Sequence, residues 1–440
     1  MLSRCKSLAA AIPGCRPVSS FSLPSSSSIP RTSPALSLPH SHSRTLSASA
    51  RMSNFKQEPH KLLVIPGPIE VTDEVLYANA HPSMSHVSPD FIPVFGDCIR
   101  MIREVLFAGP QAQPFIISGS GTLGWDQVSA NLVEPGESVL VLNSGYFGDS
   151  FADCLRTYGA VVDELHAPFG TAVELSSLEA ALKSKKYKLV TFTHVDTSTG
   201  VLSDAKGIAE VVKSASPETL VALDGVCSVA SEEIQMDAWG IDVVLTASQK
   251  GLGVPPGLSI LVASEKAMKV FEARKSPVTS YYGSWKKWLP IMRAYENGSA
   301  AYFATPPVNL IYAFHTSLTQ LTKRAPSLQE RFALHREASA RVKKAAEELG
   351  LRQLPLDSKY AANGMTALYF PDGLVASDLL PRLGKRDVIV AGGLHKDHKE
   401  KYFRIGHMGV SVVDKMRGDI DKVIAALKES LAEAKASKNV

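Results

Sequence analysis

Apolar and polar residues follow one another along this chain in two patterns that predict two kinds of element. Apolar spacing of three to four residues predicts an amphipathic helix over 90–107. Short apolar runs predict buried strands at 138–143, 160–166, 188–194, 219–224, 241–248 and 258–264. Apolar strands in alternation with helices are typical of a mostly parallel sheet that is covered on both faces. The pattern therefore predicts an α/β fold.

The pattern changes after the apolar segment 305–321. A long charged helix is predicted over 327–349, and weaker strands follow at 365–370, 387–393 and 401–407, before a last amphipathic helix from about Asp414. We interpret 52–310 as a large domain and 311–440 as a smaller C-terminal α+β domain.

The first 51 residues differ in composition from the rest. They hold Arg4, Lys6, Arg16, Arg31, Arg44 and Arg51, no acidic residue, and many Ser and Pro. This composition favours disorder and is typical of an organellar transit peptide, which predicts a mitochondrial matrix protein. A start at Met52 would give a cytosolic or peroxisomal form. Since the whole chain carries only +4, the six charges of this segment leave residues 52–440 at about −2, which argues against nucleic-acid binding.

Hydropathy and cysteine spacing argue against a membrane-spanning protein, a zinc site and a disulfide framework. No apolar run approaches the roughly 18 residues of a membrane-spanning helix. The cysteines lack C-x-x-C spacing, so neither a zinc site nor a disulfide framework is predicted, and we expect no metal. They are Cys5, Cys15, Cys98, Cys154 and Cys227.

A glycine-rich stretch, "SGSGTLG", matches the G-x-G-x-x-G spacing of a dinucleotide-binding turn. Such a turn should follow the first strand, and an acidic residue should end the next one. Here a helix precedes the stretch, and the next strand ends at Asn143. We instead expect Ser120, Gly121 and Thr122 to open a helix whose N–H groups and hydroxyls receive a phosphate. Capping of that helix by the two hydroxyls is the simpler alternative.

Two charged residues follow neighbouring predicted strands. Lys250 comes after an apolar strand and enters a turn rich in Gly and Pro, and Asp224 ends the strand before. Desolvation lowers the pKa of a lysine and makes its amine nucleophilic. A lysine that forms a Schiff base, with an aspartate facing the pyridinium nitrogen, is the minimal arrangement for pyridoxal phosphate.

Eight short motifs occur in an order that resembles a known family. They are "PGPI", "SGSGT", "SGYFG", "STG", "LDGVCS", "SQKGLGVPPG", "YFATPP" and "FRIGHMG". In this order they resemble class V aminotransferases of fold type I, most nearly the alanine–glyoxylate and serine–pyruvate branch. The resemblance covers about residues 61–430. It implies a seven-stranded, mostly parallel sheet in the large domain, bound pyridoxal 5'-phosphate and a homodimer with shared active sites.

The resemblance also implies a role for single residues. Lys250 matches the Schiff-base lysine and Asp224 the partner of the ring nitrogen. Arg404 matches the arginine that binds the substrate carboxylate, and Gly67 of "PGPI" lies at the substrate. Further cofactor contacts are implied for Ser120, Gly121, Thr122, Gln249, Phe147 (where Trp is frequent), Thr197, and the pair Tyr302 and Thr305, which belongs to the other subunit's site.

The predicted activity is therefore ping-pong transfer of an amino group from alanine or serine to glyoxylate or pyruvate. Serine–glyoxylate, hydroxykynurenine and aminophosphonate transaminases remain alternatives within the family. A cysteine desulfurase is disfavoured because Gln249 stands where His is usual and because Cys227 is the last cysteine. A nicotinamide oxidoreductase or a silent binding protein are alternatives from other classes.

Overall fold

A computed structural model describes residues 55–438 of the chain. The predicted transit peptide and the second start at Met52 lie outside these residues. Within the described range, none of the helices combines the length and the apolarity that a bilayer crossing requires.

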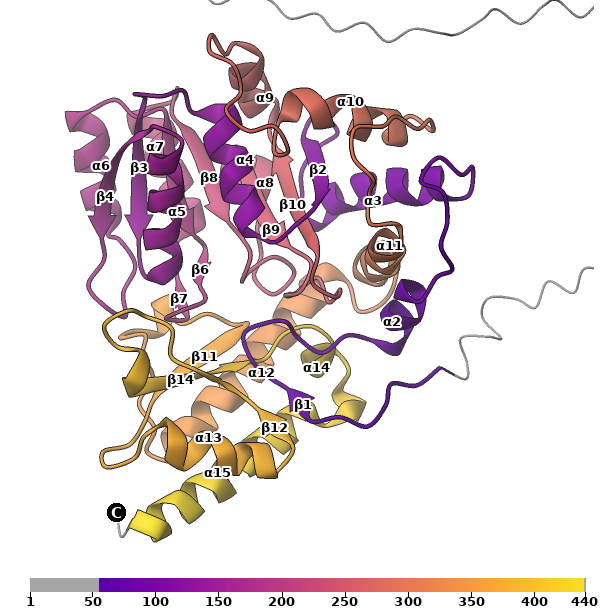
Figure 1. The fold of residues 1–440 in the computed structure, drawn as a ribbon. Helices are drawn as coiled ribbons and strands as arrows, with labels where there is room; N and C mark the ends of the chain where they lie inside the picture. Colours follow the sequence, from indigo (N-terminus) through magenta and orange to yellow (C-terminus); the bar gives the residue numbers. More distant parts are fainter. Residues whose placement is uncertain (1–54, 439–440) are drawn as a thin grey trace, which may run out of the picture. The chain divides into compact units, whose positions relative to one another are not determined.

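The largest sheet has seven strands, and β10 is antiparallel to both of its neighbours while the others are parallel (Figure 1). Every residue of its central strands β5, β8, β9 and β10 is buried, as a sheet covered on two faces requires. The predicted α/β class with a seven-stranded, mostly parallel sheet is confirmed. In spatial order the strands are β2 (Gln113–Ser118), β10 (Leu258–Ala263), β9 (Val243–Ala247), β8 (Leu220–Asp224), β5 (Leu189–Thr193), β3 (Ser138–Asn143) and β4 (Val161–His166).

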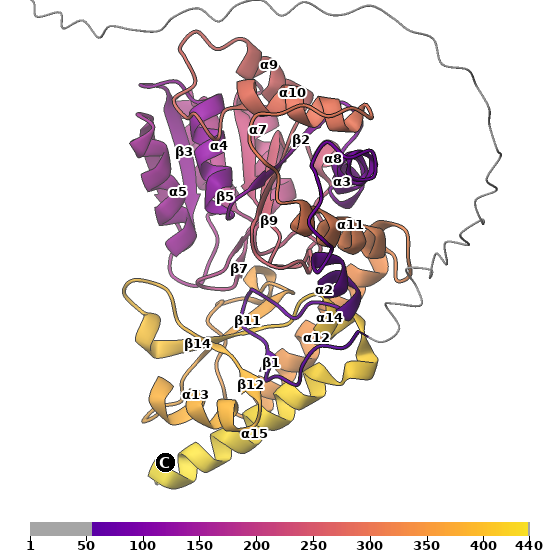
Figure 2. The same cartoon turned by 45° about the vertical axis from the view of Figure 1, so that its right-hand side comes forward.

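Helices pack on both faces of this sheet (Figures 1 and 2). Helices α4 (Thr122–Leu132) and α5 (Tyr146–Thr157) pack against each other, as do α6 (Leu175–Ser184) and α7 (Ala205–Ala215). At the β2 end, α10 (Trp285–Glu296) and α11 (Val308–Thr322) pack against α3 (Phe91–Val105). The remaining elements here are α2 (Asp73–Asn79), α8 (Met236–Trp239), α9 (Glu265–Glu272) and the hairpin β6 (Val195–Asp196) and β7 (Val201–Leu202).

The C-terminal part contains a three-stranded antiparallel sheet in the order β11 (Met365–Tyr369), β14 (Tyr402–Gly406), β13 (Ala391–Gly392). Helix α12 (Leu328–Glu348) begins with a capping box between Ser327 and Glu330. Strand β1 (Leu62–Leu63) pairs in parallel with β12 (Val388–Ile389), so a strand near the start of the described chain joins the C-terminal part. The other elements are α13 (Ala376–Lys385), α14 (Val410–Val413), α15 (Asp419–Lys438), and the 3₁₀ turns η1 (Ser358–Tyr360), η2 (Lys399–Lys401) and η3 (Lys415–Arg417).

The cores bear on the proposed domain boundary near residue 310. Ile311, Phe314 and Leu318 of α11 belong to the core around the seven-stranded sheet. The second core draws on α12, α13, β14 and α15, together with Leu62 and Val64. A two-domain division therefore stays our proposal, and the packing favours placing α11 with the large domain.

Strand direction decides where functional groups can gather. Strands β3, β5, β8 and β9 run parallel, so their carboxyl ends lie at one edge of the sheet. Asp224 is the last residue of β8, and Lys250 follows three residues after the end of β9. The edge is therefore supplied with polar side chains by neighbouring strands.

Candidate active site

A cavity of about 210 Å³ lies at the carboxyl ends of these strands. It brings together nine of the predicted site residues, from segments up to 183 positions apart in sequence. Its lining is Gly67, Ser120, Gly121, Thr122, Trp125, Phe147, Thr193, Val195, Thr197, Asp224, Val226, Gln249 and Lys250.

Asp224 lines this cavity and is buried, with 4% of the residue exposed. One carboxylate oxygen accepts the backbone N–H of Val226 at 2.9 Å, and the other accepts Nε1 of Trp125 at 2.7 Å. Burial raises the pKa of Asp224 to about 6, and the two hydrogen bonds oppose that rise. Within the described residues no Lys or Arg forms an ion pair with this carboxylate, so a cationic group in the cavity would stabilise its charge.

Lys250 is also buried, with 7% of the residue exposed, and its amine donates a hydrogen bond to the carbonyl of Pro66. Burial lowers the pKa of Lys250 from its ordinary value, which increases the neutral, nucleophilic fraction of the amine. Gly67 makes room for this side chain. A Cβ at Gly67 would lie 2.1 Å from Cδ of Lys250, and its φ of +93° also favours glycine.

The N-terminus of α4 offers a place for an anion. Gly121 is the N-cap, and in the described structure no side chain caps this helix, so the alternative that Ser120 and Thr122 serve as caps is wrong. The N–H groups of Leu123 and Gly124 donate to the carbonyls of Ser120 and Gly121, at 3.1 and 2.8 Å. The N–H groups of Gly121 and Thr122 and the hydroxyls of Ser120 and Thr122 have no partner among the described residues, so they are left for a ligand. Nearby, the buried Oε1 of Gln249 has no hydrogen-bond partner among the described residues. A side-chain amide presents either an acceptor or two N–H donors, so Gln249 fits a residue whose partner is a bound group.

Aromatic rings form one wall of the cavity. Phe147, in the first turn of α5, lines it, and its contact with the cofactor stays a prediction. Trp125 lines it too and was missed from the sequence. The Trp125 ring stacks on Phe151 at 5.6 Å between centroids and meets Phe147 edge-on at 6.3 Å. A usable signal was present, because Trp125 lies three residues after Thr122 and therefore on the same face of the helix.

Arg404 on β14 reaches the edge of this cavity from the C-terminal part of the chain. Its Nε donates to the carbonyl of Gly392 at 2.8 Å and its Nη1 to the carbonyl of Thr197 at 2.9 Å. Its Nη2 makes no hydrogen bond within the described residues. The guanidinium is thus held beside Thr197 with N–H groups left over, which suits the binding of a carboxylate.

Asp196 is a second buried carboxylate that the sequence reading missed. It accepts hydrogen bonds from the backbone N–H groups of Ser198, at 2.9 Å, and of Phe147, at 3.2 Å. These bonds tie the segment that carries Thr197 to the first turn of α5. Asp196 therefore holds two parts of the wall together without entering the cavity's lining.

Tyr302 and Thr305 do not line the cavity of their own chain. Tyr302 is 64% exposed, and its hydroxyl lies 3.5 Å from that of Thr305. These positions leave both side chains available to another molecule. Their predicted role toward a second subunit stays a prediction.

These observations fit pyridoxal phosphate. The buried amine of Lys250 matches an aldehyde, and the Asp224 carboxylate, which has no ion-pair partner among the described residues, matches a ring nitrogen. The unpartnered Gln249 and the N-terminus of α4 both match a phosphate. The residues could hold that group between Lys250 and Asp224, which both line the cavity. Such a pocket can form a covalent link to an amine and move protons beside it.

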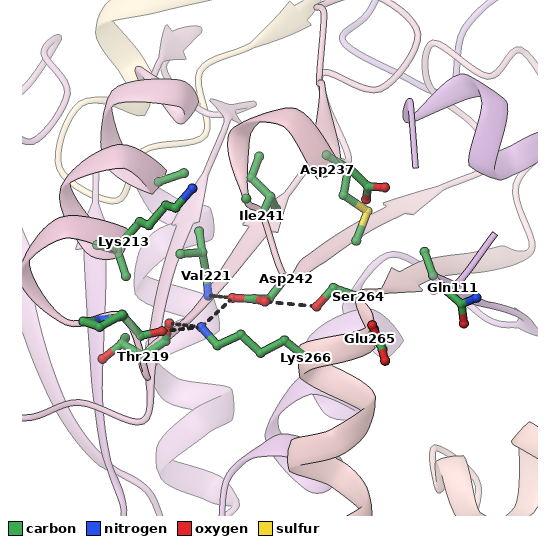
Figure 3. Close-up of a pocket in the computed structure, with 16 residues that line it drawn as sticks. Gln111, Lys213, Thr219, Val221, Asp237, Ile241, Asp242, Ser264, Glu265 and Lys266 are labelled. Atoms are coloured by element: carbon green, nitrogen blue, oxygen red, sulfur yellow. Dashed lines mark hydrogen bonds and ion pairs between the residues drawn. The ribbon is translucent and has the colours of Figure 1, made fainter. Parts of the chain in front are cut away.

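A larger cavity of about 560 Å³ lies at the opposite edge of the same sheet (Figure 3). It contains Asp242, just before β9, and Lys266, in the first turn of α9. Their groups are already paired with protein atoms, as Figure 3 shows. None of the predicted site residues lines this cavity.

Comparisons with known proteins agree with the geometry. The model of the family "Aminotransferase class-V" matches residues 70–407. Alanine–glyoxylate aminotransferase 1 of Saccharomyces cerevisiae is 42% identical over 382 residues, which cover 83% of this chain and 97% of that protein. L-aspartate–glyoxylate aminotransferase of Paracoccus denitrificans is 31% identical, over 80% and 87% of the two chains. The crystal structure of an alanine–glyoxylate aminotransferase from Nostoc sp. aligns with a TM-score of 0.78 at 28% identity, over 86% and 96%.

Proposed function

The chain belongs to the class-V aminotransferase family, and from that membership we propose that it transfers an amino group from alanine or serine to glyoxylate or pyruvate. The family implies the cofactor pyridoxal phosphate. One observation carries the proposal: a desolvated lysine and an aspartate without a cation share a cavity with an uncapped helix N-terminus. The likeness to an alanine–glyoxylate aminotransferase over most of both chains supports the substrate pair.

The cofactor, when bound, supplies an aldehyde that links to amines and a ring that accepts the electrons of a broken C–H bond. Lys250 would provide the amine for that link. Once the substrate's amine has replaced it, Lys250 would take the proton from the substrate's α-carbon and pass it to the cofactor, and it would carry a proton in the opposite direction in the second half-reaction. Asp224 would stabilise a positive charge at the ring nitrogen. Arg404 binds the α-carboxylate of each substrate in turn, so the two substrates use one site in a ping-pong cycle.

Small substrates are favoured by the charges around the cavity. Among its lining residues Lys250 is the one cation, and Arg404 stands at its edge. With Arg404 assigned to the α-carboxylate, no further cation of the lining would receive a side-chain carboxylate. This argues for alanine or serine over aspartate, the substrate in the name of the Paracoccus relative.

A desulfurase-like reaction is disfavoured by the state of the cysteine nearest to the site. Cys227 is 1% exposed, and burial raises the pKa of its thiol. A nucleophilic cysteine instead needs exposure and a lowered pKa. Cys227 is therefore better suited to packing, where its sulfur contacts Met365 at 3.8 Å.

Single-turnover spectra of the purified protein test the activity. Each amino acid of a panel is mixed with the cofactor-loaded enzyme in the absence of any acceptor. We expect alanine and serine to convert the cofactor to its amine form, and glyoxylate to convert it back. Absence of a cofactor band, or faster conversion by aspartate than by alanine, would contradict the proposal.

We also propose a homodimer in which Tyr302 and Thr305 complete the partner's site. Their exposure and their absence from their own cavity support this. A Lys250→Ala subunit and a Tyr302→Ala/Thr305→Ala subunit then carry lesions in different sites, and one site of each mixed dimer is intact. With equal amounts and free exchange, about half the dimers are mixed, so activity should return to roughly a quarter of wild type. Mixed dimers without recovered activity would remove these residues from the partner's site.

A mitochondrial location is proposed from the composition of residues 1–51. A fluorescent reporter fused to this segment should enter mitochondria. A reporter that stays in the cytosol would count against the proposal, and translation from Met52 alone provides the matched control.

A further inference from the structure

We propose that Trp125 is a positioning residue for the cofactor, which orients the Asp224 carboxylate through its indole N–H. The inference rests on the proposed function, since Asp224 must face the ring nitrogen of a bound cofactor. Trp125 lies in the first turn of α4, and Asp224 ends β8, 99 positions later in the chain. The bond between Nε1 and the carboxylate measures 2.7 Å, with both residues buried.

The two donors to Asp224 divide its carboxylate between them. Val226 N–H occupies one oxygen from the chain that follows β8, and Trp125 occupies the other from a separate helix. A carboxylate held at one oxygen can turn about its last side-chain bond, whereas one held at both cannot. Trp125 thus supplies the fixed orientation that a hydrogen bond to a ring nitrogen requires.

The ring of Trp125 carries a second part of the same task. It stacks on Phe151 and touches Phe147 edge-on, and both belong to α5. The Trp125 side chain therefore connects α4 to Asp224 on β8 and to the two phenylalanines on α5. Helix α4 also begins at the predicted phosphate site. The groups proposed to contact the phosphate, the ring nitrogen and the ring face are thus all attached to α4.

The charge of Asp224 also depends on this donor. The other charged groups that face Asp224 are Lys250, which favours the carboxylate, and Asp196, which opposes it. A hydrogen bond to the ionised form stabilises that form. Loss of the indole N–H should therefore weaken both the orientation and the charge of Asp224, and so the affinity for the cofactor.

The test compares Trp125→Phe with Trp285→Phe. Trp285 is fully buried and donates its indole N–H to Oε1 of Gln127 at 3.2 Å, outside the cavity, so the control removes an equivalent group elsewhere. The dissociation constant of pyridoxal phosphate from each apoprotein is measured by equilibrium dialysis. We expect a rise of roughly tenfold or more for Trp125→Phe, the size expected for one bond to a charged group, and less than twofold for Trp285→Phe.

An Asp224→Asn background separates orientation of Asp224 from packing. If Trp125 acts through Asp224, the two substitutions together should weaken cofactor binding little more than Asp224→Asn alone. Should Trp125→Phe fail to fold, benzothienylalanine at residue 125 keeps the bicyclic shape and lacks the N–H, and the same comparison is made with it.

The outcomes distinguish the inference from the function it rests on. Wild-type apoprotein that binds no pyridoxal phosphate overturns both. Wild type that binds and transaminates, with Trp125→Phe equal to Trp285→Phe, overturns the inference alone. Independent, multiplicative losses in the Asp224→Asn background also overturn it, because Trp125 would then act by packing only.

Discussion

We call the side of the seven-stranded sheet where the parallel strands end its carboxyl edge, and the side where they begin its amino edge. Each of these holds a buried aspartate and a lysine, but the two pairs differ in their hydrogen bonds. At the amino edge, Asp242 accepts hydrogen bonds from Ser264 and from the backbone of Val221, and Lys266 lies 3.5 Å from the same carboxylate (Figure 3). Lys266 also donates to the carbonyls of two residues before β8, at 2.8 and 2.9 Å. Every group of this pair has a protein partner.

At the carboxyl edge the corresponding groups stay apart. Asp224 receives two neutral donors and no cation, and Lys250 bonds only a backbone carbonyl. The cavity there is the smaller of the two, at about 210 against 560 Å³. The comparison teaches that charged groups without a charged partner indicate an active site better than cavity volume does. Groups that are already paired with each other have few hydrogen bonds left for a ligand.

The largest expected difference between the edges concerns the lysines. Lys250→Ala should lower the transamination rate on the order of 10⁴-fold or more, since it removes both the covalent link and the proton carrier. Lys266→Ala should keep the rate within about twofold and reduce the free energy of unfolding by about 1–2 kcal/mol, because Asp242 loses a partly exposed counterion. Steady-state rates and urea unfolding of both variants check this. Substantial turnover by Lys250→Ala would reverse the assignment of the edges.

Arg404 extends the open character of the carboxyl edge to the substrate. Arg404→Ala should lower kcat/KM. The loss of transition-state stabilisation should be roughly 2–5 kcal/mol, the range for truncating one member of a buried charge pair. Because the α-carboxylate is common to all amino acids, the loss should be similar for each amino acid of a panel. A loss confined to one substrate would mean that Arg404 recognises a side chain.

Substitution of the two aspartates should also affect the rate at the carboxyl edge more than at the amino edge. An anion beside the ring nitrogen shifts its pKa by about 1–3 units, so Asp224→Asn should lower kcat roughly ten- to a thousandfold. Asp242→Asn should leave kcat near that of wild type and lower stability instead. Equal rates for wild type and Asp224→Asn would show that Asp224 does not face the ring.

Burial of Asp224 without a cation also predicts the pH dependence of the apoprotein. Its pKa is raised from 3.8 to about 6 in the folded protein. The folded state therefore binds the proton more tightly than the unfolded chain, and the free energy of unfolding falls as pH rises from about 4 to 6. Relative to Asp224→Asn, which does not titrate, wild type should lose roughly 2–3 kcal/mol across that window. Urea unfolding at pH 4.5 and 7.5 measures it, and parallel profiles would contradict the shift.

Much of the carboxyl edge could be predicted from the sequence because strand ends are local features. Apolar runs that stop at Asp224 and shortly before Lys250 predict where both side chains emerge. The role of Trp125 could not be predicted in this way, because its bond to Asp224 joins positions 99 apart and depends on how α4 packs.

Other features depended on facts that no local pattern contains. The sequence places most of helix α11 in the smaller domain, yet its core residues pack with the large sheet. The apolar pattern of a helix does not indicate which element it packs against. The hydroxyls of Ser120 and Thr122 suited caps as well as ligands, and only the geometry of α4 separated the two readings. The part of Tyr302 and Thr305 requires a second chain.

The most direct test asks which lysine bonds the cofactor. The protein loaded with pyridoxal phosphate is treated with borohydride, which converts the link between an aldehyde and an amine into a stable secondary amine, and its peptides are mapped by mass spectrometry. The account predicts one modified site, Lys250, at near one cofactor per chain, and unmodified Lys266. Modification of Lys266 or another lysine in place of Lys250, or no modification of wild type, would contradict it.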